Sequence, residues 1–457
     1  LKRRQLWCAL AVCLVLPGIL LASVPTASAR SSTSRNTDGW WFKAMKIGQV
    51  QRHLSGKGVT VAMLDEDINL SPRELRSADV SLRKDCHGGR VHQRAVHGGS
   101  EVVRNDHGTQ MAAYVVGQGR GTGPDGSGIR GIAPNARLLF YSLDTKPEPP
   151  GKPLYLECTG LDEIKQINWA VKAGADIITI SVTTTDQWPQ MQRALHRAFA
   201  KGVVVVAATG ATFGHAASQK IGFPAGYPGV VAVNAVDAGA RPWRGNPPPT
   251  FTDEQSSYPV ISAPGVRVKG LGWYGGGWDS RATVTGTSSA TAIVAGCLAL
   301  LKQKYPDATG NQLVQDLIHY TGGSHPFDWD PHYGFGIASV TKMLQHDPTR
   351  WPDVNPLLHG PKAAVKVFPM SSYGKATAAD GSASGKASAS PTAAAAGKTG
   401  QSGKAGSVGS GAGSSGGGVP PWVWVIVAVV VLGGAGATAR MVKKRGRAEP
   451  GPGTGRV

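Results

Sequence analysis

Hydrophobic positions between residues 40 and 359 alternate between two patterns. Short apolar runs bounded by glycine or charged residues predict buried strands, and apolar residues at every third or fourth position predict helices. The predicted strands cover residues 59–64, 136–143, 176–182 and 203–208, and the predicted helices cover residues 162–173 and 190–200. Strands that alternate with helices in this way form parallel sheets covered by helices on both faces. The sequence therefore predicts an α/β fold.

Two further apolar segments have the length and flanks of membrane-directed sequences. Residues 1–29 combine a basic start, an apolar run and a small-residue cleavage sequence ending at Ala29, which predicts a signal peptide. Residues 419–440 are long enough to cross a bilayer, which takes roughly 20 residues, and the basic tail 441–457 follows. Because basic residues stay on the cytoplasmic side, we expect a single-pass cell-membrane protein with an extracellular main domain and a cytoplasmic C-terminus.

The remaining boundaries follow from composition. An N-terminal extension is expected over residues 30–55 and the main domain over residues 56–345. Residues 346–418 are expected to form a linker and a stalk, since Ala, Gly, Ser, Thr and Lys dominate from residue 371 onward. Such a composition cannot bury enough apolar area to offset the entropy of the chain, so the stalk is predicted to be flexible.

The formal net charge of +19 would suit a nucleic-acid-binding protein. Most of the net positive charge, however, lies before residue 31 and after residue 359, and the central region has only a small excess of positive charge. Binding of phosphates requires a concentrated basic face. We therefore expect no nucleic-acid partner.

The cysteines are more consistent with a disulfide formed outside the cell than with a cofactor site. Outside the cell Cys86 and Cys158 could form a disulfide, whereas Cys297 lies in an apolar helix and is expected to be buried and free. Cys86 could instead bind zinc with nearby histidines such as His87, but their spacing fits no standard ligand pattern. We expect no metal and no cofactor.

Three short segments carry the residue types of nucleophilic catalysis. They read, in chain order, V-A-M-L-D-E-D-I (61–68), N-D-H-G-T-Q-M-A-A (105–113) and V-T-G-T-S-S-A-T-A-I-V-A-G (284–296). Acyl transfer to a hydroxyl needs a base to take its proton and a carboxylate to orient the base. Asp65 ends a predicted strand, and His107 and Ser288 each begin a predicted helix, whose first N–H groups can also stabilise a developing oxyanion. These three side chains are the candidate catalytic residues.

The three segments resemble the signature blocks of the subtilase family, in the same Asp, His, Ser order. Chymotrypsin-like proteases and α/β-hydrolases arrange these residues differently along the chain. Connecting segments resemble the family as well, at residues 128–137, 223–233, 262–265 and 332–336. The resemblance implies a subtilisin-like serine endopeptidase, in which Asp65 orients His107, His107 acts as general base and acid, and Ser288 is the nucleophile.

The layout of the whole chain resembles one branch of that family. A short extension before the main domain, a low-complexity stalk and a C-terminal anchor are similar to those of the mycosins, the actinobacterial subtilases associated with type VII secretion. This resemblance implies a polypeptide substrate and, as partners, components of a secretion system.

Several positions depart from the family pattern. Glu66 and Asp67 stand where a small polar residue and glycine are usual, and these carboxylates are expected to raise the pKa of His107. The strand expected to align the substrate reads Ser181, Val182, Thr183, with threonine in place of glycine. A side chain at that position is expected to hinder the docking of a peptide.

The largest departure is Ala211, which replaces the asparagine whose amide usually donates to the oxyanion. In subtilisin the loss of that donor lowers kcat by about 10²–10³. Two functions therefore remain open. The chain is either a slow or selective endopeptidase, or a catalytically impaired subtilase that serves as a binding or structural component of a secretion system.

Overall fold

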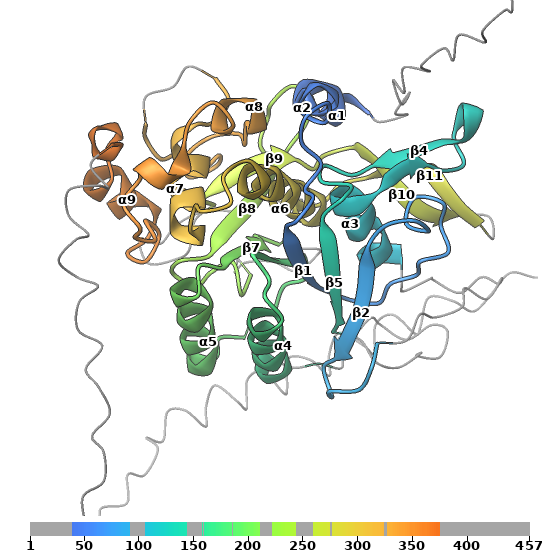
Figure 1. The fold of residues 1–457 in the computed structure, drawn as a ribbon, viewed down its shortest axis with the longest axis horizontal. Coiled ribbons are helices and arrows are strands. Elements are labelled where there is room, and N and C mark those ends of the chain that lie inside the picture. The colour runs from blue at the N-terminus through green and yellow to red at the C-terminus, as the bar shows by residue number, and fades with distance from the viewer. Residues whose placement is uncertain are drawn as a thin grey trace, which may run out of the picture. The chain divides into compact units, whose positions relative to one another are not determined.

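The computed structural model describes residues 39–91, 106–143, 158, 160–184, 186–210, 222–243, 259–274, 277–323 and 327–374. Its centre is a seven-stranded sheet with the order β2-β5-β1-β6-β7-β8-β9, in which all paired strands are parallel (Figure 1). These strands are β1 (Thr60–Asp65), β2 (Val80–Asp85), β5 (Arg137–Ser142), β6 (Ile177–Ile180), β7 (Val204–Ala208), β8 (Val231–Val236) and β9 (Ile261–Pro264). Two small antiparallel pairs lie beside the sheet: β3 (Gln118–Arg120) with β4 (Ser127–Arg130), and β10 (Val268–Tyr274) with β11 (Gly277–Val284).

The helices surround this sheet. They are α1 (Trp40–Ala44), α2 (Ile47–Val50), α3 (Asp106–Val116), α4 (Gly160–Lys172), α5 (Pro189–Ala200), α6 (Thr287–Lys304), α7 (Gly310–His319), α8 (Val340–Met343) and α9 (Pro361–Val367), with short 3-10 turns at Pro124–Gly126, Pro348–Arg350 and Met370–Ser372. Every residue of β6, β7, β8 and β9 is buried, so these strands are covered on both faces. The predicted α/β fold with a parallel sheet is confirmed.

The helix α6 is the centre of the packing. It crosses β6, β7, β8 and β9 and also contacts α3, and its residues from Ser289 to Leu301 are buried. Small residues allow this close approach: a Cβ atom on Gly296 would lie only 2.5 Å from the Cβ atom of Ile132. Burial on all sides explains why the helix has no polar face along most of its length.

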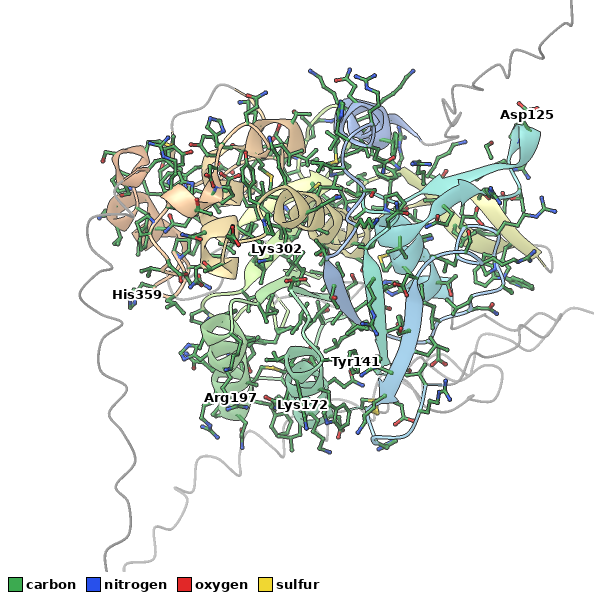
Figure 2. The ribbon with its side chains drawn as sticks, viewed as in Figure 1. Asp125, Tyr141, Lys172, Arg197, Lys302 and His359 are labelled. Atoms are coloured by element: carbon green, nitrogen blue, oxygen red, sulfur yellow. A yellow bond between two sulfur atoms is a disulfide. The ribbon has the colours of Figure 1, made fainter. Side chains whose placement is uncertain are left out.

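The helices α4 and α5 are amphipathic and pack side by side. Met191 and Leu195 of α5 are buried, whereas Lys172 and Arg197 project away from the sheet into solvent (Figure 2). Gly174 and Gly202 follow the two helices with positive φ angles of 78° and 74°. Glycine adopts this conformation at little cost and so ends each helix before the next strand.

The folded region extends further toward the C-terminus than the expected boundary at residue 345. Trp351 and Ala364 are fully buried and Leu357 nearly so, and the side-chain amide of Gln312 donates to the Trp351 carbonyl at 2.9 Å. Residues 346–374 therefore belong to the folded body rather than to a linker. Composition missed this because the segment packs through a few isolated large side chains instead of an apolar run.

The segments expected to interact with a membrane, residues 1–29 and 419–440, lie outside the described residues. So do residues 375–418 of the expected stalk. Within the part of the chain that is described, no helix is both long enough and apolar enough to span a bilayer.

Candidate active site

The carboxyl ends of three neighbouring strands meet at one edge of the sheet. Asp65, the last residue of β1, pairs in register with Ser142, the last residue of β5. On the other side of β1, Leu64 pairs with Ile180, which places Ser181 beside Asp65. Asp65 and Ser181 are both buried. Crevices at such carboxyl ends are where parallel α/β sheets carry their chemistry.

His107 is bound to Asp65 at this edge. The Nδ1 atom of His107 lies 2.7 Å from Oδ1 of Asp65, and the backbone N–H of Glu66 donates to the same oxygen at 2.8 Å. The Asp65 side chain has no exposed surface, whereas 28% of the His107 side chain is exposed. A carboxylate in this position favours the tautomer with the proton on Nδ1, in which Nε2 carries no proton.

The start of α3 is fixed against the loop that follows β1. The Thr109 hydroxyl accepts a hydrogen bond of 2.8 Å from the backbone N–H of Asn69. A Cβ atom on Gly108 would overlap the carbonyl oxygen of Asp67 and lie 3.0 Å from the ring of Phe140. The glycine after His107 is therefore required for α3 to approach the loop closely enough for the imidazole to reach Asp65.

Ser288 is the second residue of α6, where backbone N–H groups have no partner within the helix. Its hydroxyl donates to the carbonyl of Ser181 at 3.0 Å, and the Ser181 hydroxyl donates to the carbonyl of Ser288 at 3.3 Å. The preceding Thr287 hydroxyl accepts from the N–H of Gly210 at 3.2 Å. These contacts attach the beginning of α6 to the chain that leaves β6 and the chain that leaves β7.

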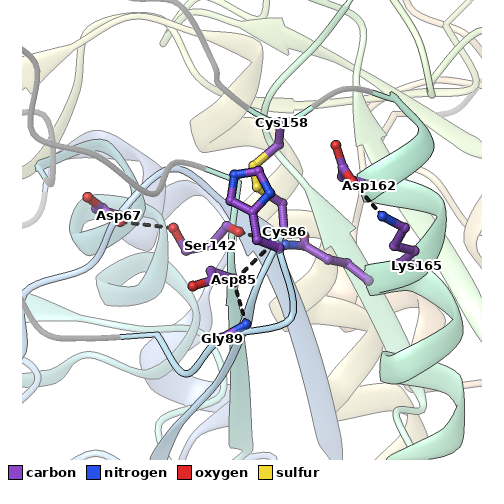
Figure 3. The surroundings of a disulfide bond; sticks show 10 residues. Asp67, Asp85, Cys86, Gly89, Ser142, Cys158, Asp162 and Lys165 are labelled. Atoms are coloured by element: carbon purple, nitrogen blue, oxygen red, sulfur yellow. Dashed lines mark hydrogen bonds and ion pairs between the residues drawn. A yellow bond between two sulfur atoms is a disulfide. The ribbon is translucent and has the colours of Figure 1, made fainter.

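The carboxylate of Asp67, one of the two departures next to Asp65, is directed toward β5. The hydroxyl of Ser142 donates to its Oδ1 atom at 2.9 Å, and Asp67 is buried (Figure 3). Ser142 also accepts a hydrogen bond of 2.6 Å at its backbone carbonyl from the side chain of Gln166 in α4. Sequence reasoning missed Ser142, since no motif marks a serine at the end of a strand. An effect of Glu66 and Asp67 on the pKa of His107 stays a prediction.

The segment expected to align the substrate leaves β6 and pairs with a distant part of the chain. Backbone hydrogen bonds of 3.0 and 2.8 Å join Thr184 to Phe223. Val182 is half-buried and Thr183 is exposed. Ala211, the position that lacks the usual asparagine, lies outside the described residues, directly after Gly210.

The expected disulfide between Cys86 and Cys158 is present, with Cα atoms 5.8 Å apart (Figure 3). It joins the turn after β2 to the residues before α4, close to the edge of the sheet that holds Asp67 and Ser142. Cys86 therefore has no free thiol for zinc. Cys297 is free and buried, as expected, and burial raises the pKa of its thiol to about 12.

Comparison with known proteins finds one matching family and several related proteases. The subtilase family, Peptidase S8, matches residues 56–336. Subtilisin DY of Bacillus licheniformis is 31% identical over 241 residues, which are 53% of this chain and 78% of that protein. The minor extracellular protease Epr of Bacillus subtilis is 28% identical over 310 residues, which are 67% of this chain but only 42% of Epr. The chain thus spans less than half of the length of Epr.

Two solved structures share the fold. Fervidolysin from Fervidobacterium pennivorans, a keratinolytic enzyme related to subtilisin, has a TM-score of 0.52 and 24% identity, over 68% of this chain and 46% of that chain. MycP1 from Mycobacterium smegmatis has a TM-score of 0.50 and 23% identity, over 71% of this chain and 88% of that chain. At these identities the similarity shows the architecture alone.

Proposed function

The chain belongs to the subtilase family of serine endopeptidases, and from this premise we propose that it hydrolyses peptide bonds through Asp65, His107 and Ser288. The observation that carries the proposal is the 2.7 Å hydrogen bond between Asp65 and His107, at the edge of the sheet where Ser181 binds Ser288. A buried carboxylate, a partly exposed imidazole and a hydroxyl at a helix N-terminus are the parts that acyl transfer requires.

The first half of the reaction forms an acyl-enzyme. The Ser288 hydroxyl turns from the Ser181 carbonyl toward Nε2 of His107, transfers its proton there, and Oγ forms a bond to the carbonyl carbon of the peptide. The carbonyl π electrons move to the oxygen, which becomes an oxyanion. Asp65 stabilises the resulting imidazolium through Nδ1. When the tetrahedral intermediate collapses, the C–N bond breaks, and Nε2 returns the proton to the leaving amine.

The second half releases the acyl group. His107 takes a proton from a water molecule, whose oxygen attacks the ester carbon and forms a second oxyanion. Collapse of this intermediate breaks the bond to Oγ, and Nε2 delivers the proton to Ser288. The enzyme returns to its starting state with one water molecule consumed.

The oxyanion would be held by fewer donors than in most of the family. The backbone N–H of Ser288, in the first turn of α6, supplies one donor. Position 211 supplies no side-chain donor, because it is alanine. We therefore propose a slow or selective endopeptidase.

A fluorophosphonate probe, which reacts with an activated serine, tests the proposal. We expect covalent labelling of the folded protein, no labelling of Ser288→Ala, and a decrease of about 10⁴ in labelling rate for Asp65→Asn, because asparagine favours the wrong tautomer of His107. The matched control is Asp307→Asn, an exposed aspartate outside the site, which is expected to label at the normal rate. If the folded protein is not labelled, the chain acts as a binding or structural component instead.

We further propose that the chain is exported and anchored, with residues 1–29 as a signal peptide and residues 419–440 as a single span. The disulfide between Cys86 and Cys158 supports this proposal, because disulfides persist in oxidising compartments. Membrane fractionation tests it: the full chain is expected in the membrane fraction, and a chain ending at residue 418 in the medium. Retention of the shortened chain in the membrane fraction would exclude the anchor.

A secretion system is the proposed setting. One solved structure that shares the fold, MycP1 from the ESX-1 type VII secretion system, has a TM-score of 0.50 and 23% identity. The proposed layout of extension, protease domain, stalk and anchor supports a similar placement beside a membrane complex. Co-purification of the full chain with secretion components from detergent-solubilised membranes tests this proposal.

A further inference from the structure

A pocket of about 640 Å³ lies between the start of α5 and the C-terminal part of the folded body. Its lining comes from three segments, residues 187–192, 225–230 and 357–362, together with Val260. Ligand-binding pockets typically have volumes of about 300–1,000 Å³. The match to the subtilase family ends at residue 336. One wall of the pocket, at residues 357–362, is therefore formed by a segment that the family match does not include.

Hydrogen bonds hold this C-terminal wall against the loop at residues 225–230. The carbonyl of Leu357 accepts from the N–H of Gly229 at 3.1 Å, and the side-chain amide of Asn355 donates to the Gly229 carbonyl at 3.0 Å. Asn355 is buried, and its Oδ1 atom accepts from the N–H of Leu357 at 2.9 Å. Contacts to the main chain therefore set the width of the pocket on this side.

The wall at the start of α5 is connected to the segment that is expected to align the substrate. The Tyr227 hydroxyl accepts from the N–H of Trp188 at 2.6 Å and donates to its carbonyl at 3.1 Å. The ring centroid of Tyr227 lies 4.9 Å from that of Phe223, which makes two backbone hydrogen bonds with Thr184. Thr184 and Trp188 are four positions apart, so their Cα atoms are separated by at most about 14 Å. A polypeptide that lies along the aligning segment can therefore reach the pocket with residues a few positions away from the cleaved bond.

The composition of the lining indicates the kind of ligand that the pocket fits. Lys362 and His359 line it and are exposed, and the described lining residues include no Asp or Glu. Figure 2 shows His359 at the edge of the molecule, on the same side as α5. Flat apolar groups are supplied by an indole and three proline rings: Trp188, Pro189, Pro228 and Pro361. A ligand that combines carboxylates with an aromatic or prolyl ring would complement this lining.

We propose that this pocket binds an acidic segment of the polypeptide substrate, a few residues away from the bond that Ser288 attacks. The role in substrate selection rests on the proposed peptidase function. A carboxylate of the segment pairs with Lys362, because hydrogen bonds between ionised groups are about twice as strong as those between neutral groups. A prolyl or aromatic ring of the segment packs on the indole and the prolines. Binding there raises the effective concentration of the substrate at Ser288 and so selects substrates by a sequence outside the catalytic site.

Peptide binding to the full chain with Ser288→Ala tests the inference without hydrolysis. The probe is a fluorescently labelled peptide of sequence D-D-P-F-D-D, and its neutral counterpart is N-N-P-F-N-N. We expect the acidic peptide to bind at least about 10-fold more tightly, as measured by fluorescence anisotropy at low salt, because only its carboxylates can pair with Lys362. The difference is expected to shrink at high salt, which screens exposed charges. Equal affinities of the two peptides at low salt would contradict the inference.

Two pairs of variants locate the binding site. Lys362→Gln removes a positive charge from the pocket, and Gln192→Glu adds a negative charge to its α5 wall with little change in size. Each is expected to weaken binding of the acidic peptide at least about 5-fold, since like charges repel and the favourable pair is lost. The matched controls are Lys366→Gln and Gln190→Glu, at exposed positions of the same two helices that do not line the pocket. If the controls weaken binding as much as the pocket variants do, the peptide binds elsewhere and the inference is wrong.

Cleavage of extended substrates tests the role in substrate selection. A short peptide substrate is joined at either end to the acidic or the neutral sequence through six Gly or Ser residues, which span about 13 Å on average. With the natural protein, one of the two acidic extensions is expected to lower KM at least about 5-fold relative to its neutral counterpart and to leave kcat unchanged, because the added contact is the same in the ground state and the transition state. Lys362→Gln is expected to abolish this advantage, and Lys366→Gln is expected to retain it.

The outcomes distinguish this inference from the proposed function. If a fluorophosphonate labels Ser288 but neither acidic extension lowers KM, the inference fails and the peptidase assignment stands. If the acidic peptide binds at the pocket but no fluorophosphonate labels the folded protein, the peptidase function fails. The pocket is then a peptide-binding site of a component without catalytic activity.

Discussion

At the scale of single residues, the site depends on glycines as much as on the three candidate catalytic residues, because each glycine allows another group to come close. Gly108 lets His107 reach Asp65, and Gly210 and Gly222 let Thr183 pack closely against them. The sequence motif explains the first of these glycines, because it follows the histidine directly. It does not explain the others, since their neighbours come from segments dozens of positions away and are known only once the chain is folded.

Replacement of Gly108 tests the first of these close approaches. The new methyl group of Gly108→Ala would overlap the Asp67 carbonyl, and overpacking of this kind typically costs about 1–3 kcal/mol. We expect α3 to move away from β1, fluorophosphonate labelling to slow at least about 10-fold, and the thermal midpoint to fall. The control is Gly277→Ala, since no atom of the described residues, apart from its chain neighbours, would lie within 4 Å of a Cβ atom there. Equal labelling rates for the two variants would contradict the requirement.

Replacement of Ala211 tests whether the missing donor limits the reaction. Ala211→Asn restores an amide at the position where the family usually has one, and such a donor contributes about 10²–10³ to kcat in subtilisin. We expect kcat for a peptide substrate to rise at least about 10-fold with little change in KM, because the new hydrogen bond forms only with the oxyanion. An unchanged kcat would mean that another group already supplies the second donor.

At the scale of elements, the predictable parts of the fold are those buried on both sides. The predicted strands at residues 59–64 and 203–208 differ from β1 and β7 by one residue at one or both ends, because a continuous apolar run is all that such a strand needs. β2 was not predicted: it is only half-buried and includes the exposed residues Arg83 and Lys84. Its position at the edge of the sheet is set by pairing with β5 and not by its own pattern.

The helix α7 carries a buried carboxyl group that no sequence pattern indicated. Asp316 is fully buried, and burial, with a contribution from the charge of Asp347, raises its pKa from 3.8 to about 9. Between these pH values the unfolded chain loses the proton while the folded protein keeps it. Stability is therefore expected to fall as pH rises from about 4 to about 9.

The variant Asp316→Asn has no proton to lose, so its thermal midpoint is expected to stay flatter over this pH range. At pH 8 it is expected to exceed that of the natural protein by at least about 2 °C, the lower end of the shift that 1 kcal/mol produces in a domain of 150–250 residues. At pH 4 the two should be similar. Asp307→Asn, at an exposed position, is expected to retain the natural pH dependence. Parallel pH profiles for Asp316→Asn and the natural protein would contradict the assignment.

At the scale of the whole molecule, the candidate catalytic residues are predictions from local motifs, but the contacts that hold the start of α6 at the sheet edge could not be predicted in that way. Ser288 and Ser181 are 107 positions apart, and Gly210 and Thr287 are 77 positions apart. Each of these hydrogen bonds depends on α6 lying across β6 and β7. The C-terminal limit of the folded body could not be predicted either, because the segment after residue 345 is stabilised by contacts with α7 and not by a hydrophobic pattern of its own.

Residues 346–374 are expected to stabilise the folded body. Trp351 is fully buried and stacks on His319 of α7, with ring centroids 4.0 Å apart, and the Nε2 atom of His319 lies 2.7 Å from the Phe368 carbonyl. Truncation of one buried tryptophan to alanine typically costs about 3–5 kcal/mol. A chain that ends at residue 345 loses this side chain and exposes the apolar surface that it covers. We therefore expect its free energy of unfolding in urea to be lower, by at least about 3 kcal/mol, than that of a chain ending at residue 374.

Both chains lack the stalk and the anchor, so the comparison isolates residues 346–374. Equal urea midpoints would show that these residues lie on a body that is already complete, whereas loss of cooperative unfolding in the shorter chain would show that they are part of its core.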